Sequence, residues 1–161
     1  MAGCEIRGEH VFRRTAVLDC PVDRVWATVT TQRGINQEMG PYLKMTMPRR
    51  FRGRSIADVA PGTRIGKSYL LLFGLLPFGS DDITIAEIEP GRMFREVSSM
   101  TGMRTWVHHR TVESLGARTV LTDEVRLAPR FPVPGLGAVL ARVLSAFFAH
   151  RHRRLGSLLV S

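Results

Sequence analysis

The second half of the chain is divided into strand-length segments that end in turn signals. Five such segments follow one another, and most of them close with proline or glycine: 63–74, 81–91, 92–102, 103–116 and 117–130. Strands joined by short turns pair antiparallel, because a parallel pair needs a long crossover connection. The pattern therefore predicts an antiparallel meander.

A segment with helical periodicity follows the meander. After Pro132 and Pro134, residues 135–160 place apolar side chains at helical spacing. A one-sided helix has to bury its stripe against the sheet, so we expect a curved sheet around this helix, with room for a cavity between them. The stripe expected to face the sheet comprises Leu136, Val139, Leu140, Val143, Leu144, Phe147 and Phe148.

The first 62 residues predict a further strand and two short helices. Residues 10–19 form the strand, and a helix follows with Pro21 near its first turn. A second short helix in 31–41 is expected to be broken by Gly34 and Gly40, and 41–62 is expected to be irregular. The predicted fold class is α+β, with about six antiparallel strands, a short helix pair after the first strand and a long C-terminal helix. Residues 1–161 are interpreted as a single domain, with 1–9 a flexible N-terminal tail.

This order of elements resembles the helix-grip fold of the START and Bet v 1-like superfamily, also called SRPBCC. Four segments are similar to those of bacterial SRPBCC proteins labelled polyketide cyclases or ligand-binding proteins: "LLLFGLLPF", "FREVS", "WVHHR" and "FFAHRHRRL". The resemblance extends from about Val11 to Leu159. It implies the fold and leaves the function open, because the superfamily contains carriers, receptors and enzymes.

Charge and cysteine content limit the partners of this chain. The net charge is +9, and only Lys44 and Lys67 are lysines among 23 basic residues. Such a balance favours anionic partners, or it reflects the coding bias of a GC-rich genome. No motif of a nucleic-acid-binding module is present, so we expect no nucleic-acid partner. The two cysteines, Cys4 and Cys20, lack the spacing of metal ligands and form no disulfide framework. We therefore expect no cofactor or metal and a cytoplasmic location.

The longest apolar run does not predict a membrane span. Residues 69–79 fall far short of the ~20 apolar residues that cross a bilayer. We therefore expect no stable membrane insertion, while transient contact with a membrane stays open.

The segment 103–116 carries two adjacent histidines, which must point to opposite faces of a sheet. A two-residue turn at Leu115 and Gly116 would place His108 opposite Asp123 on the next strand. The face that carries His108 also carries Trp106 and is the more apolar one. The prediction is that His108 points inward, within hydrogen-bond reach of Asp123, and that His109 is exposed on the outer face.

His108 and Asp123 have two interpretations. In the functional one, His108 transfers a proton or anchors a polar group of a ligand, with Glu96 as a third catalytic candidate. In the structural one, the pair belongs to a buried polar network that satisfies itself, joined by Arg110 and Glu96. The position of Glu96 depends on register, because a slip of one residue would turn it to solvent.

The leading hypothesis is that the protein binds a hydrophobic small molecule, lipid-, polyketide- or aromatic-like, between its sheet and its C-terminal helix. Methionines in 39–48 are expected near the cavity entrance, and His150, Arg151 and Arg154 are candidates for a basic rim that recognises a carboxylate or phosphate. The predicted ligand-binding residues are Trp106, His108, Arg110, Asp123, Phe94, Glu96, Tyr69, Phe147 and Phe148.

Two other functions compete with simple binding. The first is an enzyme that resembles aromatase/cyclases, in which His108 and Asp123 promote proton transfer during aldol ring closure. The second is a peripheral lipid carrier that contacts anionic lipid through two arginine clusters, one at Arg49–Arg54 and one at Arg151–Arg154. Whether the protein is an enzyme, and its oligomeric state, stay open at this point.

Overall fold

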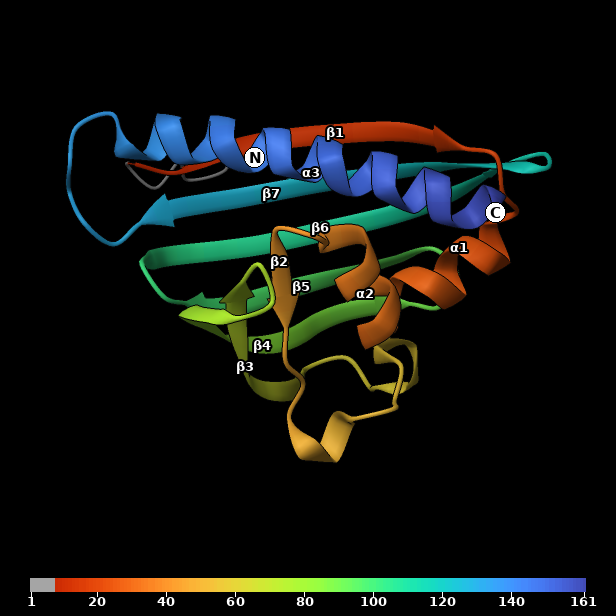
Figure 1. Cartoon of the computed structure of the whole chain (residues 1–161), viewed down its shortest axis with the longest axis horizontal. Helices are drawn as coiled ribbons and strands as arrows, with labels where there is room; N and C mark the ends of the chain where they lie inside the picture. Colours follow the sequence, from red (N-terminus) through yellow and green to blue (C-terminus); the bar gives the residue numbers. More distant parts are fainter. Residues whose placement is uncertain (1–7) are drawn as a thin grey trace, which may run out of the picture.

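A computed structural model describes residues 8–161, in which seven strands form one antiparallel sheet and three α-helices cover it (Figure 1). The order in the sheet is β1-β7-β6-β5-β4-β3-β2. The strands are β1 (His10–Leu18), β2 (Leu43–Met45), β3 (Thr63–Leu72), β4 (Leu76–Glu89), β5 (Met93–Met100), β6 (Met103–Leu115) and β7 (Arg118–Pro129). The helices are α1 (Val22–Val29), α2 (Gln32–Met39) and α3 (Leu136–Val160), and Arg49–Phe51 and Ile56–Asp58 form 3-10 turns. Most of the predicted tail of residues 1–9, with Cys4, lies outside the described residues.

The helices cover the concave face of the sheet in two parts. α3 packs along β1 and β7, while α2 packs against both α3 and β2 (Figure 1). Because β2 pairs with β3 at the far edge of the sheet, its contact with α2 closes the space above β3 to β6. This arrangement confirms the predicted helix-grip fold. Among the described residues, no helix is both long and apolar enough to cross a membrane.

The strands differ from the prediction at the edge of the sheet. The structure has seven strands instead of about six, because Leu43–Met45, in a segment predicted as irregular, pairs with β3. Three residues are too few to show strand periodicity. β4 begins at Leu76 rather than at residue 81, since Phe73 and Gly74 adopt positive φ angles of 51° and 72° and make a tight turn. The apolar run 69–79 is therefore the tip of the β3–β4 hairpin.

Gly34 does not break α2, contrary to the prediction. A Cβ atom at this position would lie 1.9 Å from the carbonyl oxygen of Thr28 at the end of α1. Glycine is needed because the two short helices meet there. The Thr31 hydroxyl accepts a hydrogen bond from the Gly34 amide at 3.1 Å and caps the start of α2. Gly40 does mark the end of this helix.

The apolar stripe predicted for α3 is partly wrong. Phe148 is buried and Phe147 is half-buried, but Val139 and Val143 are 57% and 60% exposed. The prediction failed because α3 is apolar on two sides, and periodicity alone does not say which side meets the sheet. The buried residues of α3 are Gly137, Phe148, Arg151, His152, Leu155 and Leu159.

The β6–β7 hairpin turns at Gly116 and Ala117, one residue later than predicted. His108 therefore lies opposite Val125, and Arg110 lies opposite Asp123. A turn that lies one residue later shifts the cross-strand partner of each residue by two positions. Because the direction of side chains repeats every two residues along a strand, this shift leaves each side chain on the same face. The predicted faces are thus correct although the predicted pairs are not.

His108 is buried on the inner face, as predicted, and His109 lies on the outer face. His109 is half-buried rather than exposed, because Arg95 and Glu124 flank it on the neighbouring strands.

Candidate functional site

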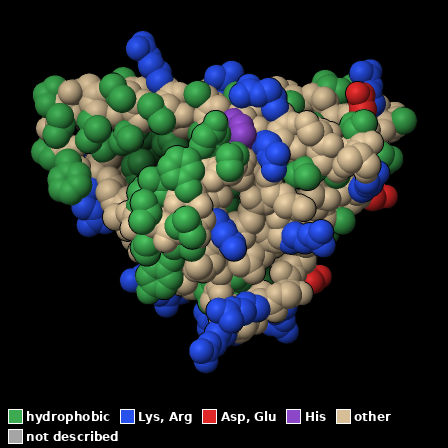
Figure 2. All heavy atoms as spheres, in the orientation of Figure 1, with side chains coloured by type: hydrophobic (Ala, Val, Ile, Leu, Met, Phe, Trp, Pro, Cys, Tyr) green, Lys and Arg blue, Asp and Glu red, His purple; other side chains and the backbone are tan. Residues whose placement is uncertain are grey.

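A cavity of about 140 Å³ lies between the concave face of β3 to β6 and the elements that cover it. Figure 2 shows that the surface is hollowed between α3 and the β3–β4 hairpin, with hydrophobic side chains on both sides. The apolar lining comprises Val29, Ile35, Met39, Leu43, Met45, Met47, Ile56, Ile65, Leu70, Phe78, Ile83, Ile85, Phe94, Met100, Trp106, Leu144, Phe147 and Phe148. Methionines from the predicted segment 39–48 are thus part of the wall.

The size of the cavity suits a small apolar molecule. An engineered apolar cavity of about 150 Å³ stays dry and binds benzene. Sites for drug-sized ligands are larger, about 300–1,000 Å³. In this conformation the cavity accepts a ligand of about one ring.

Seven of the nine predicted ligand-binding residues line the cavity: Trp106, His108, Arg110, Phe94, Glu96, Phe147 and Phe148. Asp123 is fully buried behind His108 and Arg110 and does not reach the cavity surface. Tyr69 is wrong as a pocket residue, because it is 53% exposed. Its neighbours Ser68 and Leu70 are buried on the inner face, and alternation along β3 turns Tyr69 to the outside.

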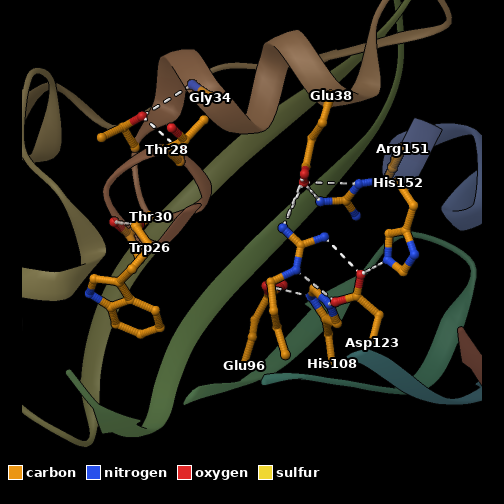
Figure 3. A network of polar contacts seen from close by, with 12 residues as sticks. Trp26, Thr28, Thr30, Gly34, Glu38, Glu96, His108, Asp123, Arg151 and His152 are labelled. Atoms are coloured by element: carbon orange, nitrogen blue, oxygen red, sulfur yellow. Dashed lines mark hydrogen bonds and ion pairs between the residues drawn. The ribbon is translucent and has the colours of Figure 1, made fainter. Parts of the chain in front are cut away.

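Asp123 is the centre of a buried polar network beneath the cavity (Figure 3). Arg110 donates to it twice, from Nε to Oδ1 at 2.7 Å and from Nη2 to Oδ2 at 2.8 Å. The Nε2 atom of His108 lies 2.7 Å from Oδ1, which confirms the predicted contact. The Nε2 atom of His152, on α3, lies 2.6 Å from Oδ2. The carboxylate of Asp123 thus accepts four hydrogen bonds.

Glu38 joins α2 to the same network. Arg110 donates from Nη1 to its two carboxylate oxygens at 2.9 and 3.1 Å. Arg151 on α3 donates to Glu38 Oε1 from Nε at 3.1 Å and also from Nη2. The Arg151 guanidinium further lies 4.5 Å from the centre of the Phe148 ring. Glu38 therefore connects two helices to the sheet.

The electrostatics of the network favour ionised groups. Burial would raise the pKa of Asp123, but the charge and hydrogen bonds of Arg110, with those of His108, hold it well below its ordinary value. Burial would lower the pKa of His108, but Asp123 and then Glu96 raise it above its ordinary value, which favours the imidazolium form.

Glu96 extends the network toward β4. Its Oε2 atom lies 3.7 Å from His108 Nδ1, and the Ser98 hydroxyl donates to its Oε1 at 2.9 Å. Burial would raise the pKa of Glu96, but His108, Ser98 and the charge of Arg151 keep it below its ordinary value. Both nitrogens of His108 therefore face carboxylates, which supports the structural interpretation of this histidine.

The predicted basic rim does not form as expected. Arg151 is buried, and its charge is matched by Glu38. His150 donates from Nε2 to the carbonyl oxygen of Gly40 at 2.7 Å, and Arg154 is exposed on the surface. Arg151 thus points into the buried network, while His150 and Arg154 lie near Gly40, so the three side chains do not form one rim.

Sequence reasoning missed three polar residues of the site: Glu38, Asp81 and His152. Asp81 alternates with Ile83 and Ile85 on the inner face of β4, so strand periodicity could have found it. His152 lies one helical turn after Phe148 on the buried side of α3. No local signal marks Glu38, because it sits in a short helix between polar and apolar neighbours.

Asp81 differs from the other acidic residues of the site. It lines the cavity at 3% exposure, and burial, followed by the negative charge of Glu96, raises its pKa to about 8. Its carboxyl group is therefore protonated at neutral pH. Its Oδ1 atom makes no hydrogen bond within residues 8–161. In the same part of the chain, no group of three or more His, Cys, Asp or Glu residues could hold a metal ion.

Comparisons with known proteins place these features in context. A family model described as "Domain of unknown function (DUF8410)" matches residues 16–159. No curated protein matches the chain in sequence.

Solved structures share the fold at low sequence identity. A START superfamily protein from Mycobacterium smegmatis has a TM-score of 0.68 and 13% identity, over 93% of this chain and 97% of that one. The Zhui aromatase/cyclase from Streptomyces sp. R1128 has a TM-score of 0.67 and 13% identity, over 94% and 93%. A protein from Chromobacterium violaceum has a TM-score of 0.72 and 16% identity, over 92% and 96%. These similarities show a START/Bet v 1-like fold.

Proposed function

The chain belongs to the family described as Domain of unknown function (DUF8410), and we propose from its cavity that it binds a hydrophobic small molecule between the sheet and α3. The observation that carries this proposal is the cavity of about 140 Å³ with a mainly apolar lining. At about 24 cal/mol per Å³, an empty cavity of this size costs about 3 kcal/mol of stability. A bound ligand would offset that cost.

The side chains that line the cavity can adapt to apolar ligands of different shapes. Met39, Met45, Met47 and Met100 contribute flexible thioether side chains, which fit irregular apolar surfaces. Phe94 and Trp106 add aromatic faces to the wall. Lipid-, polyketide- and aromatic-like ligands all match this chemistry, and the volume favours those with about one ring or a short chain inside.

A methionine-methyl NMR titration tests the proposal directly. We expect ethylbenzene to shift the methyl signals of the four cavity methionines, while the signals of Met93 and Met103, which do not line the cavity, stay in place. Ile83→Phe should fill the cavity and weaken binding at least tenfold. Val143→Phe, on the exposed side of α3, is the matched control and should leave binding unchanged. Unchanged cavity methionines at saturating ethylbenzene would contradict the proposal.

We prefer binding to the aromatase/cyclase alternative because of the surroundings of His108 and Asp123. Asp123 is sealed beneath the cavity and accepts four hydrogen bonds. Both nitrogens of His108 are directed at carboxylates, which leaves neither free to take a proton from a substrate. A cyclase would need a different proton carrier.

The β3–β4 hairpin supports transient membrane contact as a second candidate function. Its tip exposes Phe73, Leu75, Leu76 and Phe78, with Leu75 at 80% exposure, and Phe78 also lines the cavity. An exposed apolar patch of this kind is typical of an interaction surface. Arg49, Arg50, Arg52 and Arg54 are exposed as expected, but the second arginine cluster is smaller than predicted because Arg151 is buried.

Vesicle binding tests this candidate. We expect the protein to bind phosphatidylserine-containing vesicles at low salt, and the bound fraction to fall steeply as salt rises, because exposed charges are screened within ~10 Å at 0.1 M. Replacing Leu75 and Leu76 with Glu should abolish the binding. Leu115→Glu, at the tip of the β6–β7 hairpin, is the matched control and should have no effect. Absence of binding at low salt would end this candidate.

A further inference from the structure

Ser68 Oγ and the Oδ1 atom of Asp81 are buried polar atoms without a hydrogen-bond partner among the described residues. The two residues lie directly opposite each other on β3 and β4, both on the inner face of the sheet. Ser68 is fully buried and Asp81 nearly so. An unmade hydrogen bond of a buried polar group costs stability. Asp81 is the one that reaches the cavity surface.

The other charged groups of the lining are already matched. Arg110 pairs with Asp123 and Glu38, Arg151 pairs with Glu38, and His108 lies between Asp123 and Glu96. A ligand carboxylate would therefore meet no cation in the lining that lacks a carboxylate partner. It would instead meet Glu96 and Asp81, and burying an unpaired charge there is unfavourable.

From this geometry we propose that Asp81, with Ser68 beside it on the neighbouring strand, forms a hydrogen bond with the carbonyl or hydroxyl oxygen of an uncharged apolar ligand in the cavity. The inference rests on the proposed binding function and deepens it by naming the ligand class. Uncharged aryl ketones, aldehydes, esters and phenols belong to this class, while free fatty acids and other carboxylates do not.

The protonation state of Asp81 supports the donor role. Burial and the charge of Glu96 on β5 raise its pKa to about 8, and Asp82 on its own strand adds a small repulsion. A hydrogen bond with Ser98 on β5 lowers the pKa of Asp81, and a hydrogen bond with Glu96 raises it further. Ser68 on β3 is a neutral neighbour, while Arg151 on α3 and His108 on β6 act on Glu96. The carboxyl group thus donates a hydrogen bond to an acceptor below about pH 8, and the carboxylate above that pH repels the same acceptor.

Three probes of similar size separate the ligand classes: acetophenone, ethylbenzene and benzoate. Binding is measured from the methyl signals of the cavity methionines. In the wild-type protein we expect acetophenone and ethylbenzene to bind at pH 6.5 and benzoate not to bind detectably. Acetophenone affinity should fall at least tenfold between pH 6.5 and pH 9.5, well beyond any change for ethylbenzene.

Variants of Asp81 test its role as the donor. Asp81→Leu should reduce the ratio of acetophenone to ethylbenzene affinity by about tenfold, the size of one lost hydrogen bond, with ethylbenzene binding retained. Asp81→Asn keeps a donor and should preserve the ratio while abolishing its pH dependence. Asp82→Asn, on the neighbouring residue that pairs with Arg64, is the matched control and should behave as the wild type.

The outcomes separate this inference from the proposed function. If ethylbenzene does not shift the methyl signals of the cavity methionines, both the proposed binding function and this inference are contradicted. If ethylbenzene binds but Asp81→Leu leaves the ratio unchanged, or if benzoate binds as well as acetophenone, only the inference is overturned.

Discussion

Replacing Arg110 with Met should destabilise the protein by about 5 kcal/mol, or prevent folding at neutral pH. Its fully buried guanidinium is shared between Asp123 and Glu38, and removing one partner of a buried ion pair costs about 3–5 kcal/mol. Here one substitution removes the arginine partner of Asp123 and leaves Glu38 paired with Arg151 alone. Methionine fills similar space, so lost packing contributes little. Denaturant unfolding followed by circular dichroism measures the change.

The charge origin of this loss can be checked with compensating variants. Adding Glu38→Gln and Asp123→Asn to Arg110→Met should recover a large part of the lost stability, because no unpaired charge is then buried. Arg126→Met, on the half-exposed outer side of β7, is the matched control and should change the free energy of unfolding by less than about 0.5 kcal/mol. A loss for Arg110→Met no larger than that of the control would contradict the structural role of the network.

Asp81→Asn should stabilise the protein at alkaline pH, by an amount that grows as the pH rises. In the wild-type chain, the carboxyl group of Asp81 loses its proton near the ordinary value of 3.8 when unfolded, but only near pH 8 when folded. Between these two values the unfolded state binds fewer protons, so stability falls as pH rises through this window and levels off above about pH 8. The total effect is about 6 kcal/mol, because the pKa difference is about 4.2 units and each unit corresponds to about 1.36 kcal/mol.

Unfolding free energies of the wild type and of Asp81→Asn, measured from pH 5 to pH 9.5, test this expectation. The difference should increase by several kcal/mol up to about pH 8 and then stay constant. Asp82→Asn is the control, because Asp82 is paired with Arg64 on the outer face and its pKa is lowered rather than raised. A constant difference between Asp81→Asn and the wild type would show that Asp81 is ionised in the folded protein at neutral pH.

The buried network also explains how the cavity keeps its shape. Glu38 connects α2 to Arg151 on α3 and to Arg110 on β6, so three elements that enclose the cavity share one set of ion pairs. Directional hydrogen bonds of this kind fix the spacing between layers more strictly than apolar contacts do. The network thus joins the elements on one side of the cavity, while methionine side chains contribute to the rest of its lining.

The sequence by itself determined the meander, the long C-terminal helix and the inward face of β6. These features are local: turn residues and side-chain alternation act over a few positions, and alternation has a period of two. For this reason His108 was placed correctly although the predicted hairpin turn was one residue early. The same alternation places Asp81 on the inner face of β4 with Ile83 and Ile85, so the sequence could have identified it as a buried residue.

Only the tertiary structure decided which side of α3 is buried and which groups complete the polar network. Glu38 and Arg151 are 113 residues apart in the chain, and no local pattern predicts their contact. Val143 and Phe148 are both apolar, yet only the packing of α3 on β1 and β7 exposes the first and buries the second. The protonation of Asp81 likewise depends on burial next to Glu96, which arises when β4 and β5 pair. Contacts between distant segments, rather than residue types, set the chemistry of this cavity.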